Sequence, residues 1–193
     1  AVSRGLSPAG MALLGTLQPM VTALIAQRLF AEKVGRRFWG GLLAGVATAV
    51  KSLAPRVRVV GVEPACTPRM TRSLEAGHPI TVPGAAGVAD GLLAVRPGDI
   101  TFAQIQAHVD EIVIVEDDAI IDALRWVFDR ARIVAEPSGA APVAAALARG
   151  TTSWSRDGAS AARDVDGLAV ALVSGGNVET AAFSRYITQG KVA

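Results

Sequence analysis

Three short stretches of this sequence place a hydroxyl or carboxyl side chain beside glycines. They are Ser174-Gly175-Gly176-Asn177, Glu136-Pro137-Ser138-Gly139-Ala140 and Val88-Ala89-Asp90-Gly91. Glycine lets a backbone approach a ligand closely, and a serine hydroxyl can donate or accept a hydrogen bond. Taken singly, the stretches also fit ordinary structures: a tight turn, a capped helix start with a solvated carboxylate, and a loop.

A fourth stretch contains the glycine pair Gly40-Gly41, which precedes a long apolar run. Backbone N–H groups at the start of a helix can surround a phosphate, because they lack an acceptor within the helix and lie at the positive end of its dipole. Two glycines are a weak signal by themselves, and the bulky Phe38 and Trp39 stand directly before them. A phosphate site and an ordinary helix start are both open here.

Other common catalytic sets are absent from the sequence. Cys66 is the only cysteine, which excludes an internal disulfide and fits a reducing compartment. His78 and His108 stand alone on a predicted loop and helix, whereas zinc needs three or four ligands. We therefore predict no metal centre. No strand is followed by the full dinucleotide-binding glycine pattern, so a nicotinamide-binding domain is a poor fit.

β-Branched runs alternate with helical patterns along the chain. The former predict buried strands, and apolar runs bounded by proline or glycine predict helices. This alternation indicates an α/β fold with an open, mostly parallel sheet and helices on both faces. Ligands bind such sheets at the carboxyl ends of the strands. The expected strands are 57–62, 112–115 and 168–173, and the expected helices are 42–53, 68–76, 101–109, 116–132 and 141–149.

Local signals predict where several helices begin and end. Thr101 followed by Gln104 is a capping-box pattern, which favours a helix start at Thr101. Ser138 is a suitable N-cap for the helix that follows it, and Gly77 favours a helix end. Lys51 lies on the predicted helix 42–53, and we expect its side chain to be exposed to solvent.

The overall composition excludes several classes of protein. With 193 residues, 51% hydrophobic and 19% charged, the chain is too apolar for intrinsic disorder. The net charge of +2 is spread without a basic stripe, so we expect no nucleic-acid partner. Residues 5–27 carry no charge, but prolines interrupt them, which favours a buried or partner-covered segment over a transmembrane helix. We recognise no targeting signal and expect a cytoplasmic protein.

Taken in order, the motifs resemble those of one known family. The chain is similar to the threonine dehydratase and serine racemase group of pyridoxal-phosphate (PLP) enzymes, which have the tryptophan-synthase-β-like fold (fold type II). The resemblance runs from residue 40 to residue 182. Its motifs are Gly40-Gly41-Leu42-Leu43-Ala44-Gly45, Val60-Gly61-Val62-Glu63-Pro64, Val88-Ala89-Asp90-Gly91, Glu136-Pro137-Ser138-Gly139-Ala140 and Ser174-Gly175-Gly176-Asn177-Val178.

The resemblance implies a β-elimination reaction on threonine or serine. In that reaction the Cα proton and the β-hydroxyl leave, and hydrolysis gives a 2-oxo acid and ammonia. A serine racemase-like isomerase is the alternative within the same family. The implied fold is the Rossmann-like large domain of a fold type II enzyme, here incomplete.

The resemblance also implies which residues contact the cofactor. Ser174 would hydrogen-bond the pyridine nitrogen, and a neutral hydroxyl makes the ring a milder electron sink than a carboxylate partner would. Glu136 would lie near the cofactor ring, and Gly91 on the substrate side. The backbone at Gly40-Gly41 would bind the phosphate. The implied cofactor-binding residues are Gly40, Gly41, Leu42, Glu136, Ser174 and Gly175.

The sequence departs from the family pattern at several positions. Phe38 and Trp39 replace the first two of four phosphate-loop glycines, and the family's Schiff-base lysine motif is absent. Some relatives bind a divalent cation at positions that correspond here to Glu63, Thr67 and Arg69, and a cationic Arg69 disfavours such a metal. The chain's lysines are Lys33, Lys51 and Lys191, and none lies in the expected motif.

These departures lead to a prediction about domains and partners. We expect residues 1–37 to form an atypical apolar, helical segment and residues 38–193 to be the C-terminal part of the PLP-enzyme large domain. Such a chain would be inactive alone and would act as a homo-oligomer or with a complementing chain that carries the lysine. A non-catalytic remnant or binding subunit is the alternative.

Overall fold

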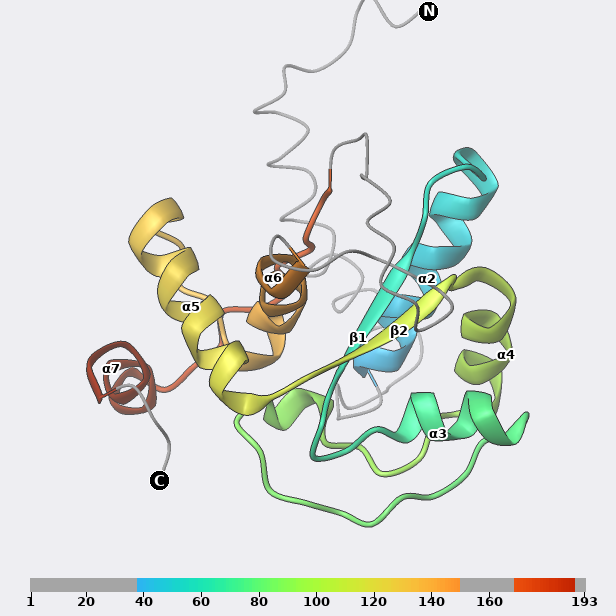
Figure 1. The fold of residues 1–193 in the computed structure, drawn as a ribbon, viewed down its shortest axis with the longest axis horizontal. Coiled ribbons are helices and arrows are strands. Elements are labelled where there is room, and N and C mark those ends of the chain that lie inside the picture. The colour runs from blue at the N-terminus through green and yellow to red at the C-terminus, as the bar shows by residue number, and fades with distance from the viewer. Residues whose placement is uncertain (1–37, 150–168, 190–193) are drawn as a thin grey trace, which may run out of the picture. The chain divides into compact units, whose positions relative to one another are not determined.

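The computed structural model describes residues 38–149 and 169–189. The predicted N-terminal segment 1–37 and the loop expected at 151–166 lie outside these residues, as do Lys33 and Lys191. The predicted domain boundary after residue 37 therefore stays a prediction. Helices and strands alternate in the described part of the chain, which confirms the α/β class (Figure 1). Its elements are α2 (Phe38–Leu53), β1 (Val60–Pro64), α3 (Arg69–Ala76), the 3₁₀ turn η1 (Asp90–Leu92), α4 (Asp99–His108), β2 (Glu111–Val115), α5 (Asp117–Ala131), α6 (Pro137–Arg149) and α7 (Thr180–Gln189).

Strands β1 and β2 pair in parallel, with Val60 opposite Glu111 and Pro64 opposite Val115. Both strands therefore end at the same edge of the sheet, which we call the carboxyl edge. Side chains alternate between the two faces of a strand. Ile112 packs into a cluster formed with α2, α3 and α4, whereas Val113 packs against α5 and α6. Helices thus cover both faces of the sheet, as predicted (Figure 1).

The predicted third strand is wrong for its described residues. Residues 169–179 have no regular secondary structure. A strand is defined by hydrogen bonds to a neighbouring strand, and within the described ranges this segment pairs with neither β1 nor β2. Ala171 and Val173 instead pack against the core cluster of α5 and α6. Only these two residues of the described run pack against helices, because Val170 and Leu172 are exposed.

Three helices begin earlier than predicted. α2 begins at Phe38, so Gly40 and Gly41 lie in its first turn. α4 begins at Asp99, and the Thr101 hydroxyl donates to the Gly98 carbonyl at 2.9 Å instead of capping an N–H group. α6 begins at Pro137, because proline suits the first helical position, where its missing N–H has no intrahelical acceptor.

One predicted helix end is confirmed. Gly77 ends α3 in the left-handed conformation with a φ of 76°, as its position after the helix indicated. In α5, Ile120 and Leu124 are fully buried, and this face packs against α6. The same helix also holds α7, because the Phe128 and Phe183 rings meet edge to face at 5.3 Å. None of the helices within 38–149 and 169–189 has the length and apolar character needed to cross a bilayer.

Candidate functional site

Residues from three predicted motifs meet at the start of α6. The Glu136 N–H donates to the Gly175 carbonyl at 3.0 Å, and the Gly91 N–H donates to the Ser138 hydroxyl at 3.0 Å. Ser138 is the second residue of α6 and not its N-cap, so its hydroxyl is available to the Gly91 loop. The structure thus brings Gly91, Glu136 and Gly175 together, although they are far apart in the sequence.

Two glycines are required by the close approach of these segments. A Cβ atom on Gly175 would lie 2.6 Å from the carboxyl carbon of Glu136. A Cβ atom on Gly139 would lie 3.0 Å from the Gly175 carbonyl oxygen and 3.1 Å from its nitrogen. The glycines therefore let the Glu136 carboxyl group and the first turn of α6 rest directly on the backbone at residues 174–175.

Glu136 has an electrostatic environment that favours its protonated form. The side chain is half-buried, and this burial raises the pKa of its carboxyl group. The negative charge of Asp90 raises the pKa further, while the Asn177 N–H partly offsets the effect by donating to the carboxylate. A carboxyl group with a raised pKa can hold and release a proton closer to neutral pH than an ordinary glutamate.

Ser174 directly precedes Gly175, whose backbone lies against the Glu136 side chain. The residue is half-buried, and its hydroxyl forms no hydrogen bond within the described part of the chain. A hydroxyl can both donate and accept, so it is available to a polar atom of a ligand. The backbone on its other side continues into the glycines that contact Glu136.

The first turn of α2 points toward the carboxyl edge of the sheet. The last turn of α2 carries Lys51, which contacts residues just before the strands, whereas Leu43 lies against Gly61 within β1. Leu42 lies within α2, where regular helix geometry pairs its N–H with the Phe38 carbonyl. The cofactor roles of Gly40, Gly41 and Leu42 stay predictions.

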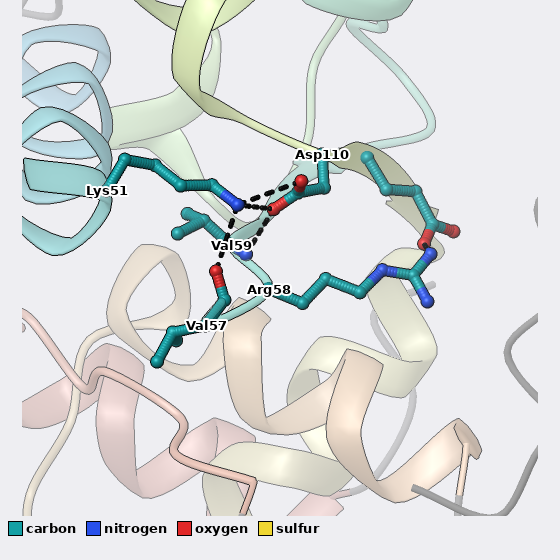
Figure 2. Close-up of polar contacts among 6 residues, drawn as sticks. Lys51, Val57, Arg58, Val59 and Asp110 are labelled. Carbon is teal, nitrogen blue, oxygen red and sulfur yellow. Dashed lines mark hydrogen bonds and ion pairs between the residues drawn. The ribbon is translucent and has the colours of Figure 1, made fainter. Parts of the chain in front are cut away.

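Lys51 is not a free surface lysine, contrary to the prediction (Figure 2). Its Nζ atom lies 2.7 Å from Asp110 Oδ2 and donates to the Val57 carbonyl at 2.9 Å, and its side chain is only 19% exposed. Asp110 also accepts the Val59 N–H at 2.7 Å. Burial by itself raises the pKa of the Asp110 carboxyl, but these two hydrogen bonds and the positive charges of Lys51 and Arg58 lower it overall.

The position of this ion pair separates Lys51 from the candidate site. Val59 and Asp110 directly precede β1 and β2, so Lys51 lies at the amino edge of the sheet. Each strand has five residues, and at roughly 3.3 Å per residue the two edges are on the order of 13 Å apart. The Lys51 amino group therefore lies at the opposite edge from the residues that meet at α6.

The three positions that correspond to a cation site in some relatives have a different arrangement here. The Glu63 carboxylate accepts the N–H groups of Met70 and Thr71, at 2.9 and 2.7 Å, and the Thr71 hydroxyl at 2.6 Å. Arg69 is buried, and its Nη1 atom donates to the Leu92 carbonyl. Within the described ranges, no three His, Cys, Asp or Glu side chains are grouped so that they could hold a metal ion.

Sequence reasoning missed three contributors to the site. Asp90 was noted only as part of a motif, yet its charge acts on Glu136. Ser138 was expected to cap a helix, yet it receives the Gly91 N–H. Arg69 was considered only as an obstacle to a metal, yet it holds the loop that contains Gly91. A buried arginine at the start of a short helix carries no local signal for such a contact.

A parallel sheet with helices on both faces is the architecture of an α/β domain, in which ligands bind at the carboxyl ends of the strands. The family described as "Pyridoxal-phosphate dependent enzyme" matches residues 39–157. The chain therefore belongs to the pyridoxal-phosphate-dependent enzyme family, as its motifs predicted.

Individual relatives agree with this assignment. The chain is 39% identical over 154 residues to an L-threonine ammonia-lyase from Thermotoga maritima, a match that covers 79% of this chain and 35% of that protein. Among solved structures it resembles maize serine racemase, with 33% identity and a TM-score of 0.62 over 78% of this chain and 44% of that one. It also resembles the processed form of threonine deaminase isoform 2 from Solanum lycopersicum, with 28% identity and a TM-score of 0.62 over 80% and 42%. The chain spans 35% to 44% of the lengths of these three proteins.

Proposed function

We propose that this chain forms the cofactor-side part of a PLP-dependent ammonia-lyase that acts on threonine or serine. The observation that carries the proposal is the meeting of Gly91, Glu136 and Gly175 at the start of α6, beside the available Ser174 hydroxyl. The names of the relatives support the substrate class, because they include an L-threonine ammonia-lyase and a threonine deaminase. The similarity to maize serine racemase favours a serine racemase-like isomerase as the second candidate.

The residues present fit the cofactor. When bound, PLP supplies an electron-withdrawing ring that makes the Cα proton of an amino acid easier to remove. In our proposal the Ser174 hydroxyl hydrogen-bonds the ring nitrogen without carrying a charge. Glu136 lies beside the ring, and its raised pKa lets it hold a proton there. The backbone N–H of Gly40, near the start of the described part of α2, would donate to the phosphate.

We further propose that the 193-residue chain does not attach the cofactor covalently. Lys51, the lysine within the described ranges, is engaged with Asp110 and Val57 at the amino edge of the sheet. Lys33 and Lys191 lie outside the described residues, and neither belongs to the motif expected for this family. Catalysis would therefore require a lysine from outside this sequence, on a longer form of the protein or on a complementing chain.

The surface of the sheet supports a need for additional cover. Strands of parallel sheets are normally covered on both faces, and here the helices leave a gap at Ile114 in β2, which is 44% exposed. We propose that a complementing chain or a second copy of this chain covers this region, and that the assembly works in the cytoplasm. If the chain instead is a non-catalytic binding subunit, it will take up PLP reversibly and remain inactive after the complementing half is added.

The test is covalent trapping of the cofactor. The purified chain is incubated with PLP, reduced with borohydride and analysed by peptide mass mapping, and 2-oxo acid formation from threonine and serine is measured in parallel. We expect reversible PLP binding, no stoichiometric label on any lysine and no turnover. Stoichiometric labelling of Lys33, Lys51 or Lys191 together with turnover would show that the chain is a complete enzyme.

A second arm distinguishes the two enzyme activities from a non-catalytic role. The chain is mixed with a separately expressed N-terminal half of a threonine ammonia-lyase that carries the family lysine. Formation of a 2-oxo acid and ammonia supports the lyase, and formation of D-serine from L-serine supports the isomerase. No product despite co-purification of the two polypeptides would contradict both and favour a binding subunit.

A further inference from the structure

The strongest unassigned feature is a buried arginine at the start of α3. Arg69 is only 7% exposed, and its Nη1 atom donates to the Leu92 carbonyl. Arginine is rarely buried without a specific partner. Here its guanidinium joins the helix that follows β1 to a turn 23 residues further along the chain. This contact needs a reason beyond the packing of α3, because a neutral side chain would pack there without the cost of desolvation.

A second buried charge explains how the guanidinium is tolerated. Burial lowers the pKa of Arg69, and the negative charge of Glu63 opposes this effect. Glu63 is 4% exposed and is held by the N–H groups at the start of α3 and by the Thr71 hydroxyl. Because Glu63 belongs to β1, the pair of charges is fixed to the carboxyl edge of the sheet.

The turn that Arg69 holds is connected to the candidate site on its other side. Within η1, the Leu92 N–H donates to the Ala89 carbonyl at 2.8 Å. The Gly91 N–H donates to Ser138 in α6 at 3.0 Å, and Asp90 acts electrostatically on Glu136. The turn therefore lies between two anchors: the Arg69 guanidinium bound to its last residue, and the Ser138 hydroxyl bound to its middle residue.

We propose that Arg69 is a positioning residue that fixes η1 against the start of α6 and thereby sets the placement of Asp90 relative to Glu136. It acts through the Leu92 carbonyl and contacts neither the cofactor nor the substrate. A role of Arg69 in catalysis rests on the proposed function. The placement of η1 by Arg69 does not, because it is a property of the chain without cofactor. The two claims can therefore fail separately.

The direct test is amide hydrogen exchange in the full chain without cofactor. In Arg69→Met, we expect the amides of Gly91, Leu92 and Leu93 to exchange about tenfold faster or more, since a hydrogen bond from a charged donor is lost. The amides of the β1–β2 ladder should be unaffected. The matched control is Arg72→Met, which removes an exposed arginine of the same helix that pairs with the exposed Glu75. Equal acceleration in both variants, or a uniform increase along the chain, would overturn the proposal.

A conservative variant keeps the test valid if Arg69→Met fails to fold. Arg69→Lys retains the positive charge and a donor group, so we expect an acceleration that is smaller than in Arg69→Met and again confined to residues 91–93. Acceleration of the whole chain in Arg69→Lys would indicate a general role in stability and would contradict positioning.

A second readout concerns the site itself. Loss of a nearby cation alone would raise the pKa of the Glu136 carboxyl, whereas movement of Asp90 away from Glu136 would lower it. Titration of the Glu136 carboxyl by carbon NMR distinguishes these outcomes, with Asp90→Asn as the reference for complete loss of the Asp90 charge. We expect the pKa to fall in Arg69→Met and to remain unchanged in Arg72→Met. A pKa that is unchanged or higher in Arg69→Met would refute an effect of Arg69 on the site.

Discussion

The close approach of Gly175 to Glu136 gives a sharp prediction for Gly175→Ala. The new Cβ atom would lie 2.6 Å from the Glu136 carboxyl carbon and 3.1 Å from its Cγ atom. Gly175 does not have the positive φ that would strain an alanine, so the main penalty is this contact. Overpacking of this kind costs about 1–3 kcal/mol, and at roughly 2–4 °C per kcal/mol the melting temperature should fall measurably.

The assay is a double-mutant cycle with Glu136→Ala, followed by urea and thermal unfolding. In the Glu136→Ala background the colliding atoms are gone, so Gly175→Ala should cost close to nothing. The matched control is Gly176→Ala, whose Cβ atom would lie 2.8 Å from the Val134 carbonyl oxygen. Its cost should be the same in both backgrounds, because that contact is with the backbone. An undiminished cost of Gly175→Ala in the absence of the Glu136 side chain would refute the proposed contact.

Three further predictions concern charge and ligand binding. The pKa of Asp110 is lowered in the folded chain, so Asp110→Asn should destabilise the chain near neutral pH by up to about 1 kcal/mol. Urea unfolding at several pH values should show that this difference vanishes as the pH falls through the lowered pKa. Because the pKa of Glu136 is raised, its stabilising contribution is lost as the pH rises through that pKa, so Glu136→Gln should be more stable than the wild type near neutral pH and equal to it in acid. Ser174→Ala should weaken reversible PLP binding about two- to tenfold in a fluorescence titration without changing stability. Ser184→Ala, on the exposed side of α7, should leave PLP binding unchanged. Equal affinities in the two variants would contradict the role of Ser174.

Local residue patterns predicted some of the secondary-structure elements. The run at 112–115 and the glycine at 77 predicted β2 and the end of α3, because burial and left-handed backbone leave clear signals in the residue types. The prediction of a strand at 168–173 failed, because an apolar run does not by itself show that its residues are buried or paired: Val170 and Leu172 are exposed. The start of α6 at Pro137 was missed because Ser138 also suits an N-cap.

The grouping of the candidate site residues was predicted from the resemblance to a family and not from local patterns. The order of the motifs, and not any spacing within them, indicated that Gly91, Glu136 and Ser174 belong to one site. Contacts between distant residues were beyond local patterns. The Lys51–Asp110 ion pair spans 59 positions in the sequence, and the Arg69–Leu92 contact joins a helix to a turn. These two contacts place Lys51 at the amino edge of the sheet and Arg69 at its carboxyl edge.

The Lys51–Asp110–Val59 contacts have a consequence for how the chain folds. Val59 and Asp110 are 51 positions apart, and closing a loop of this length costs about 3.5 kcal/mol in its length-dependent entropy. The parallel β1–β2 ladder cannot form until that cost is met, since its first residues directly follow these two. In the folded chain, contacts that join α2 to both strand starts hold the ends of this loop together. The ion pair at the amino edge is therefore expected to offset part of the loop-closure cost, by up to about 1 kcal/mol, whereas the residues at the carboxyl edge remain free to be selected for chemistry.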